Sequence, residues 1–313
     1  NCGTHANSDR MLLSARLVLA DGTLLDTGDK ASRRAFSESH GEFLRTVEAL
    51  RDRVRGDKVL TERIRHKYSI KNVMGLNLLP LVQFDDPFEI IAHLLVGSEG
   101  TLAFLAGVTM RTEREYAHKA SAMVYFGDIG EASRAVVEMR KLQDAAGERI
   151  VHSAEMLDRK SLASVGDTAG AGLTAVLTET KAHTPEELTA NVARIEELLG
   201  RFALHVPARF TDDPAEQAKY WAVRSGIFPA VGGSRPAGTT CLIEDVAFHI
   251  EDLPRATAEL QAPIARHGYD DACIYGHALE GNYHFIINQS FSTPAEAARY
   301  EALMDDVVEL VVG

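Results

Sequence analysis

Two helix-start signals in the second part of the chain constrain its fold more than any other feature. The sequence TPEE at 184–187 joins an N-cap threonine, a proline at the first helical position and a capping-box glutamate, and TPAE at 293–296 repeats the device. Around them, after Arg114, strand-like runs such as SAMVYFGD, LTAVLTET and CLIEDVAF alternate with amphipathic helical patterns. This alternation, with antiparallel return strands, predicts an α+β fold in which helices pack on a sheet. The predicted helices cover 129–142, 185–199, 216–223, 253–267 and the stretch after 293, and a further strand is predicted at 204–210.

The first part of the chain is predicted to begin with strands and to continue with charged helices. The sequence SARLVLADGTLLD at 14–26 has two apolar runs around Asp21-Gly22, which is typical of a tight hairpin turn. Residues 30–68 are strongly charged with apolar residues at helical spacing, so we expect a solvated helix and then a basic link that ends in RIRHKYSIK. A further helix is predicted at 88–95, and the apolar run at 102–112 predicts a strand pair.

Charge and cysteine content exclude several classes of function. With 33 basic and 45 acidic residues the formal net charge is -12, which argues against general nucleic-acid binding. Cys2, Cys241 and Cys273 form no CxxC pair, so neither a disulfide framework nor a thiolate zinc site is indicated. No stretch is long and apolar enough to cross a bilayer and no signal sequence opens the chain, so we expect a cytoplasmic protein. The first residue, Asn1, and the apolar ending VVELVVG indicate a piece of a longer protein.

The stretch YGHALEGNYHF at 275–285 brings two histidines together. With Glu280-Gly281 as a two-residue turn, His277 would lie directly opposite His284, with Cβ atoms about 4.5–5.5 Å apart, so that both imidazoles could reach one metal ion. A metal also needs a third protein ligand, and Glu280 at the apex is expected to point away. The alternative is a hydrogen-bonded or solvated histidine pair on the polar face of a hairpin, although the glycines of this stretch leave room for a ligand.

A glycine turn lies inside HLLVGSEGTLAF at 93–104. Gly97 and Gly100 let backbone N–H groups approach an anion or a planar ring, and Ser98 and Thr101 add hydroxyl donors. The alternative is an ordinary turn between a helix and a strand. The chain contains neither GxxxxGK[ST] nor a GxGxxG after a strand, so neither a P-loop nor a Rossmann fingerprint is present.

A candidate carboxylate-binding residue occurs in KYWAVRSGIFP at 219–229. Trp221 and Arg224 are three residues apart on a predicted helix and therefore share a face. An arginine beside an aromatic ring offers a planar fork for a carboxylate and a wall that excludes water. The alternative is a surface arginine packed on the tryptophan.

Together these segments resemble a known family, the FAD-linked oxidases of the vanillyl-alcohol-oxidase or PCMH type, in the D-2-hydroxy-acid dehydrogenase branch. LVLADGTLLDTGD resembles the family's VLADG hairpin, KNVMGLNL its KN-TG segment, VGSEGTLAF its GSEGTLG flavin loop and YGHALEGNYHF its GH-xx-GN-x-H metal loop. The four blocks follow the family order over residues 1 to about 290. The resemblance is nearest to the large bacterial D-2-hydroxyglutarate dehydrogenase-like proteins, which carry an iron–sulfur domain after this unit.

The resemblance implies a division into two domains and a set of site residues. Residues 1–112 would be the C-terminal part of a PCMH-type FAD-binding domain, and 113–313 a truncated cap domain of antiparallel sheet plus helices. Arg224 and Asn282 would contact the substrate, and His277 and His284 would hold a divalent metal, Zn or Mn. The residues expected to contact FAD are Asn1, Cys2, Gly3, Thr4, Asn72, Gly75, Gly97, Ser98, Glu99, Gly100, Thr101 and Leu102.

The chain also departs from the family pattern. The loop that grips the FAD pyrophosphate would lie before Asn1, and the glutamate that completes the metal site, followed by the histidine that is the candidate base, would lie beyond Gly313. Ala103 replaces the usual glycine after GTL. Glu244 and Asp245 stand near the position where some relatives carry a substrate-binding lysine, which leaves the substrate open.

The resemblance predicts that the full-length protein oxidises a D-2-hydroxy acid, such as D-2-hydroxyglutarate, to the 2-oxo acid with FAD as cofactor. Electrons would pass to an acceptor other than NAD, or to an electron-transfer domain whose iron–sulfur cluster lies outside this chain. Oxidation of D-lactate or glycolate is the alternative within this class, and a non-catalytic binding fragment that lacks FAD and metal is the alternative from another class. The sequence leaves the oligomeric state open, with a homodimer as one option.

Overall fold

The computed structural model describes residues 7–71, 75–113, 115–167 and 170–313 of the chain. The chain divides into two compact units, Asn1–Arg114 and Glu115–Gly313, called here the first and second unit. Within the described ranges no helix combines the length and the apolar character that a membrane span requires.

The first unit contains a three-stranded antiparallel sheet with the order β2-β1-β3. The turn between β1 and β2 contains Gly22 at a φ of 87°, which favours glycine and agrees with the predicted hairpin. The strand pair predicted at 102–112 is wrong, because this run forms one strand that pairs with β1 across the sheet. The strands are β1 (Leu12–Val18), β2 (Leu24–Asp26) and β3 (Phe104–Met110).

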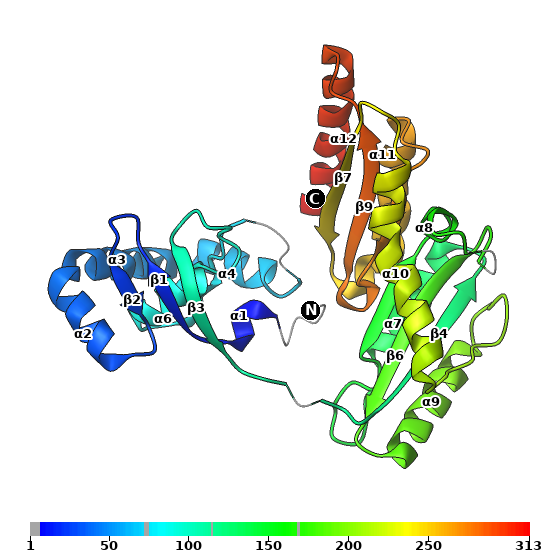
Figure 1. Ribbon diagram of the computed structural model, residues 1–313, viewed down its shortest axis with the longest axis horizontal. Helices are drawn as coiled ribbons and strands as arrows, with labels where there is room; N and C mark the ends of the chain where they lie inside the picture. The colour runs from blue at the N-terminus through cyan, green and yellow to red at the C-terminus, as the bar shows by residue number, and fades with distance from the viewer. Residues whose placement is uncertain (1–6, 72–74, 114, 168–169) are drawn as a thin grey trace. The chain divides into compact units, whose positions relative to one another are not determined.

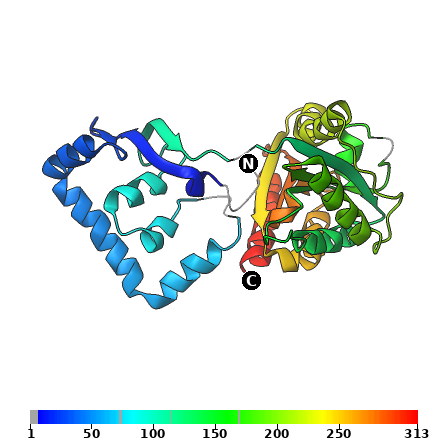
Figure 2. The same cartoon turned by 90° about the horizontal axis from the view of Figure 1, so that it is seen from below.

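Helices cover part of this sheet, as Figure 2 shows. The charged segment 30–68 forms three helices because Asp29 and Asp57 each cap a helix start with the side chain, and the predicted basic link is helical. Leu17, Leu25 and Ile90 are fully buried in the core between sheet and helices, whereas β3 stays exposed along most of its length. The helices are α1 (Ser8–Met11), α2 (Lys30–Ser39), α3 (Gly41–Gly56), α4 (Lys58–Lys67), α5 (Leu79–Gln83) and α6 (Pro87–Leu94).

The second unit is built on a six-stranded antiparallel sheet with the order β4-β6-β5-β8-β9-β7 (Figure 1). Strand β5 has the sequence SAEML and was not predicted, because four of its five residues are buried and the period-two alternation is lost. The strands are β4 (His118–Phe126), β5 (Ser153–Leu157), β6 (Thr174–Ala182), β7 (Thr240–Ala247), β8 (Cys273–Gly276) and β9 (Asn282–Gln289).

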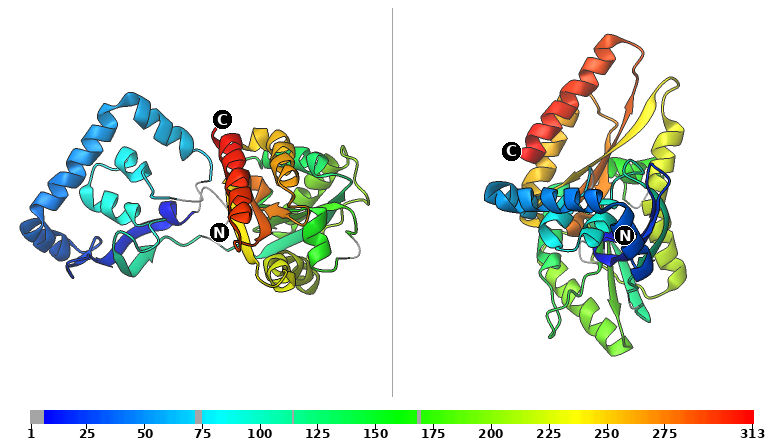
Figure 3. Two further views of the ribbon diagram at one scale, coloured as in Figure 1. Left: turned by 90° about the horizontal axis from the view of Figure 1, so that it is seen from above. Right: turned by 90° about the vertical axis from the view of Figure 1, so that its left-hand side faces the viewer.

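Helices pack on both faces of this sheet. The first face carries α7, α9, α11 and α12 over an apolar core, and Figure 3 shows α12 beside α11. The second face carries α8 and α10 over a smaller core, and α10 crosses β4 and β6 in Figure 1. The helices are α7 (Ile129–Arg140), α8 (Arg159–Ser164), α9 (Pro185–Leu199), α10 (Pro214–Ser234), α11 (Leu253–Arg266) and α12 (Pro294–Val312), and one-turn 3-10 helices lie at η1 (Ile250–Asp252) and η2 (Ala278–Glu280).

The helix-start signals agree with the structure better than the weaker patterns do. Thr293 and Glu296 form the complete capping box at the start of α12. At α9 Thr184 caps the helix, but the Glu187 carboxylate accepts from the backbone N–H of His183 instead of Thr184. The strand predicted at 204–210 is wrong, because these residues form no strand and Leu204 makes one isolated bridge with Phe126. The helix predicted at 216–223 is longer, at 214–234.

Candidate functional site

Polar and charged side chains gather on the second face of the six-stranded sheet, and we call this group the polar cluster. It consists of Glu155 on β5, Arg224 on α10, His277 after β8, His284 on β9 and Asp245 on β7. Segments up to 129 residues apart in sequence thus meet on one face, since alternate strand residues point to the same side of a sheet. The structure brings together three residues that the sequence predicted and two that it did not assign to the site.

The two histidines are neighbours, but not in the predicted register. The strand pairing sets His284 opposite Tyr275 on β8 and opposite Asp245 on β7. His277 lies beyond the end of β8, directly before η2, so the predicted His277–His284 cross-strand pair is wrong. Their rings still meet edge to face, with centroids 5.2 Å apart.

Two glycines shape the loop between the histidines. Gly281 has a φ of 66°, and a Cβ there would lie 2.2 Å from the carbonyl oxygen of Phe248. A Cβ on Gly276 would lie 2.9 Å from the carbonyl oxygen of Asn282. Glycine is therefore required at these two positions because the backbone packs closely against itself. This requirement exists without a bound ligand.

The loop between the histidines is held by buried polar contacts. Glu280 is buried and forms an ion pair with Arg149 at 2.8 Å, so it faces the protein and not solvent. Asn282 is fully buried and its amide donates to the carbonyl of Val246 at 2.9 Å. This bond gives Asn282 a role in loop structure, and its predicted contact with substrate stays a prediction.

Glu155 is the central residue of the polar cluster. Its side chain is 1% exposed, and its two oxygens accept from Arg224 Nε and from His277 Nδ1, each at 2.8 Å. Burial alone would raise the pKa of Glu155, but the hydrogen bond and charge of His277 and the charge of Arg224 together lower it to about 2. The only sequence signal for this residue was a glutamate inside an apolar run, where a buried charge requires partners.

Arg224 is fixed on two sides. Nε donates to Glu155, and the guanidinium lies over the ring of Tyr275 with its central carbon 4.6 Å from the ring centroid. The aromatic wall is therefore Tyr275, where the sequence predicted Trp221. Across the part of the chain that the structure describes, no hydrogen bond involves the two terminal nitrogens of Arg224, so the fork that binds carboxylates is available.

Each histidine of the cluster meets a carboxylate at the same ring atom. His277 uses Nδ1 toward Glu155, and His284 Nδ1 contacts a carboxylate oxygen of Asp245. Histidines that bind a metal usually have such a carboxylate on the other nitrogen, which leaves Nε2 as the ligand. The donor set fits two ligands of a metal site, but among the described residues no group of three histidine, cysteine or acidic side chains could hold a metal ion.

The glycine turn of the first unit has the conformation that its sequence suggests. Gly97 and Gly100 have φ values of 83° and 77°, and Glu99 also lies in the left-handed region at 51°. A Cβ on Gly97 would lie 3.1 Å from the carbonyl oxygen of Gly75, so two residues of the predicted FAD set approach each other closely. The bare backbone of this turn fits a planar or anionic ligand.

The hydroxyl groups of the turn are used within the turn itself. Ser98 Oγ donates to the carbonyl of Leu95 at 2.8 Å, and Thr101 Oγ1 donates to the carbonyl of Ser98 at 2.6 Å. Ligand contacts here would therefore come from the backbone. Of the other predicted FAD contacts, Asn1, Cys2, Gly3, Thr4 and Asn72 lie outside the described residues.

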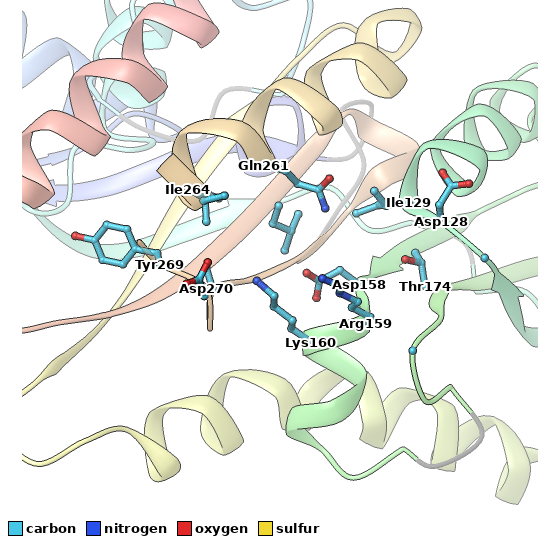
Figure 4. Close-up of a pocket in the computed structure, with 15 residues that line it drawn as sticks. Asp128, Ile129, Asp158, Arg159, Lys160, Thr174, Gln261, Ile264, Tyr269 and Asp270 are labelled. Carbon is cyan, nitrogen blue, oxygen red and sulfur yellow. The ribbon is translucent and has the colours of Figure 1, made fainter. Parts of the chain in front are cut away.

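A cavity of about 530 Å³ lies elsewhere in the second unit (Figure 4). Lys160, Gln261 and Asp270 line it, together with the buried Asp158 that caps α8. None of its lining residues belongs to the polar cluster. The cavity and the polar cluster are therefore distinct features of this unit.

The second unit is thus an antiparallel sheet with helices on both faces and a histidine–arginine cluster on one face. A family model described as FAD linked oxidases, C-terminal domain, matches residues 115–313. The chain belongs to this family. The match confirms the predicted family and fold class.

Curated relatives fit the predicted branch of the family. The glycolate oxidase subunit GlcD of Escherichia coli strain K12 is 27% identical over 233 residues, which cover 73% of this chain and 44% of the relative. The mitochondrial D-lactate dehydrogenase [cytochrome] of Arabidopsis thaliana is 25% identical over 224 residues, which cover 68% of this chain and 36% of the relative. The chain thus spans less than half the length of these relatives.

Solved structures share the fold at low sequence identity. An alkyldihydroxyacetonephosphate synthase superposes with a TM-score of 0.55 and 12% identity, over 97% of this chain and 49% of that one. The 4-ethylphenol oxidase from Gulosibacter chungangensis gives a TM-score of 0.55 and 13% identity, over 98% of this chain and 56% of that one. At such identities the likeness supports the fold alone.

Proposed function

We propose that the full-length protein oxidises a D-2-hydroxy acid of the D-2-hydroxyglutarate kind to the 2-oxo acid. The observation that carries the proposal is Arg224, whose free fork is held beside two histidines by the buried Glu155. A carboxylate bound to the fork would bring the neighbouring hydroxyl toward His277 and His284. The family match and the names of the two relatives, a glycolate oxidase and a D-lactate dehydrogenase, support the same reaction class.

The two parts of the chain would have different tasks. Residues 1–112 would form the C-terminal part of the FAD-binding domain, with backbone contacts to FAD from Gly75 and the turn 97–102. Residues 113–313 would form the cap domain, which binds the substrate. Bound FAD supplies the acceptor for the hydride that leaves C2 of the hydroxy acid.

The residues of the polar cluster would bind and orient the hydroxy acid. Arg224 holds the carboxylate through two parallel hydrogen bonds, and the Tyr275 ring below it excludes water from one side. Glu155 accepts from Nε of Arg224, whereas the fork consists of the two terminal nitrogens. Arg224 can therefore bind an anion and keep its hydrogen bond to Glu155. The proton of the hydroxyl group passes to a base that we expect outside the described residues.

His277 and His284 would supply two ligands of a divalent metal through Nε2. Such an ion lowers the pKa of a bound hydroxyl group and orients it. A site built on two imidazoles needs a further protein ligand, and the resemblance to the family places a glutamate in that role. Zinc and manganese both suit a set of imidazole and carboxylate ligands.

The electron acceptor is proposed from the resemblance, and the location in the cell from the cysteine content and the apolar pattern of the sequence. Electrons would leave the reduced flavin for a non-NAD acceptor or an appended iron–sulfur domain. We expect a cytoplasmic protein, with a homodimer as one option.

The direct test uses the purified full-length protein. Its absorption spectrum is expected to show bound flavin, and dye reduction is expected with D-2-hydroxyglutarate, with D-lactate and glycolate compared as alternative substrates. L-2-hydroxyglutarate is the matched control, because it has the same carboxylates and the opposite configuration at C2. Bound flavin without turnover of any hydroxy acid would refute the proposed substrate class, and absence of flavin would refute the enzyme function.

A second candidate function, from another class, is non-catalytic binding. The piece described here would then be a binding fragment that holds neither FAD nor metal on its own. Titration of the isolated piece with FAD and with Mn²⁺ tests this candidate, because binding of either one would exclude it.

A further inference from the structure

One buried carboxylate connects the two halves of the polar cluster. Oε2 of Glu155 accepts from Arg224 Nε and Oε1 accepts from His277 Nδ1, each at 2.8 Å. Glu155 lies on β5, which is bonded to β6 on one side and β8 on the other, so its backbone is fixed in the middle of the sheet. The partners lie 69 and 122 residues away in sequence, on α10 and after β8.

A buried carboxylate is not the most stabilising choice for this position. Taking a carboxylate out of water costs several kcal/mol, and a well-packed apolar residue often stabilises a protein equally well. On this face Leu157 and Leu177 next to Glu155 are apolar, whereas the Ser153 hydroxyl donates to Oε1 at 3.4 Å. What the carboxylate provides here is two acceptor oxygens with fixed directions.

We propose that Glu155 is the positioning residue that sets Arg224 and His277 relative to each other. On one side it holds the guanidinium through Nε, and this bond uses neither terminal nitrogen. On the other side it fixes His277 as the tautomer with hydrogen on Nδ1, so that the lone pair lies on Nε2. The inference rests on the proposed function, in which the fork binds the substrate carboxylate and Nε2 is a ligand.

The chemistry of an amide makes the proposal testable. A carboxylate offers two acceptors, whereas the amide of glutamine offers one acceptor and one donor. In Glu155→Gln the amide can accept from Arg224 only if its NH₂ group faces His277. His277 must then accept at Nδ1 and carry its hydrogen on Nε2, which removes the lone pair needed for a metal. If the amide flips instead, its NH₂ group faces Arg224 Nε and the fork is displaced.

The experiment compares full-length wild type with Glu155→Gln and Glu155→Asp. Asp158→Asn is the matched control, because Asp158 is also buried, lies three residues further along the same segment and keeps its helix-capping acceptor as asparagine. Three readouts are taken: Mn²⁺ affinity by calorimetric titration, KM and kcat for the hydroxy acid, and the ¹⁵N chemical shifts that report the tautomer of His277. Melting temperatures show that each variant is folded.

For Glu155→Gln we expect Mn²⁺ affinity to fall by about 10–100-fold, as for other residues that orient a metal ligand. We also expect His277 to change tautomer or KM to rise, according to the side to which the amide turns. Glu155→Asp keeps the charge but is one methylene shorter, so it is expected to retain one partner and lose the other. Asp158→Asn keeps an N-cap acceptor, so its melting temperature, Mn²⁺ affinity and KM should stay near those of wild type.

Unchanged Mn²⁺ affinity, tautomer and KM in a folded Glu155→Gln variant would overturn the proposal and leave the proposed function intact. A loss of stability in Glu155→Gln without any change in these three readouts would reduce Glu155 to a structural residue. If Glu155→Gln does not fold, the same readouts on Glu155→Asp decide the question. Wild type without turnover would refute the proposed function, while the tautomer and Mn²⁺ measurements would still test the positioning role.

Discussion

The two faces of the six-stranded sheet are built from the same strands and differ sharply in chemistry. On the first face Met156, Tyr283 and Phe285 are buried against four helices. On the second face the residues next to them in sequence, Glu155 and His284, belong to the polar cluster. Because side chains alternate along a strand, one face can bury apolar area while the other holds charges in fixed directions.

The apolar first face stabilises the sheet that carries the buried charges of the second face. A shift of one residue in the register of β9 would exchange His284 with Phe285 and place the wrong chemistry on each face. The apolar first face makes such a shift costly, so it fixes the register on which the second face depends. We therefore expect first-face substitutions to act on stability and second-face substitutions to act on function.

The largest effect is expected from Phe285→Ala on the first face. Its side chain is fully buried, so the free energy of unfolding should fall by about 3–5 kcal/mol. Denaturant unfolding of the full-length protein measures this loss. At a temperature where the variant is folded, kcat should stay near that of wild type. A large loss of kcat would contradict the claim that first-face residues act on stability alone.

The next effect is expected from Arg224→Lys on the second face. Lysine keeps the charge but cannot make the two parallel bonds of a guanidinium, so kcat/KM should fall by roughly 100-fold, about 3 kcal/mol. The melting temperature should change little in comparison. Steady-state dye reduction with the preferred hydroxy acid measures the loss, and an unchanged kcat/KM would remove Arg224 from the site.

A third prediction concerns acid stability. The folded-state pKa of Glu155 is lowered to about 2 from its ordinary value of 4.5, so its ionised form stabilises the fold above that ordinary value. This contribution, roughly 3 kcal/mol at most, is lost as pH falls from 4.5 toward 2. Unfolding free energies measured across this range should fall less steeply in Glu155→Gln than in wild type. Equal pH dependence of the unfolding free energy in the two proteins would mean that ionised Glu155 does not stabilise the fold.

The smallest effect is expected from Thr293→Ala at the start of α12, a first-face helix. The threonine side chain accepts from the backbone N–H of Glu296 within a capping box, and its removal should cost about 1 kcal/mol. Thermal unfolding should show this decrease, while Mn²⁺ affinity and KM stay at wild-type values. Loss of Mn²⁺ affinity would show that helix α12 influences the second face.

The sequence predicted what depends on local pattern and missed what depends on distant partners. The capping box at Thr293 and the hairpin at Gly22 follow from a few adjacent residues, and the structure contains both. The opposition of His277 and His284 was wrong because η2 widens the turn, and a single sequence does not specify that irregular loop. Glu155 escaped prediction because its role exists only through residues 69 and 122 positions away.

The most direct test of the central claim follows flavin reduction in the full-length protein under anaerobic conditions in a stopped-flow instrument. With D-2-hydroxyglutarate or the preferred D-hydroxy acid, the flavin absorption of wild type should bleach with a rate that saturates. In Arg224→Lys the substrate concentration for half-saturation should rise strongly, and the L-enantiomer should leave the flavin oxidised in both proteins. Equal half-saturation in the two proteins would contradict the assignment of the second-face polar cluster as the substrate site.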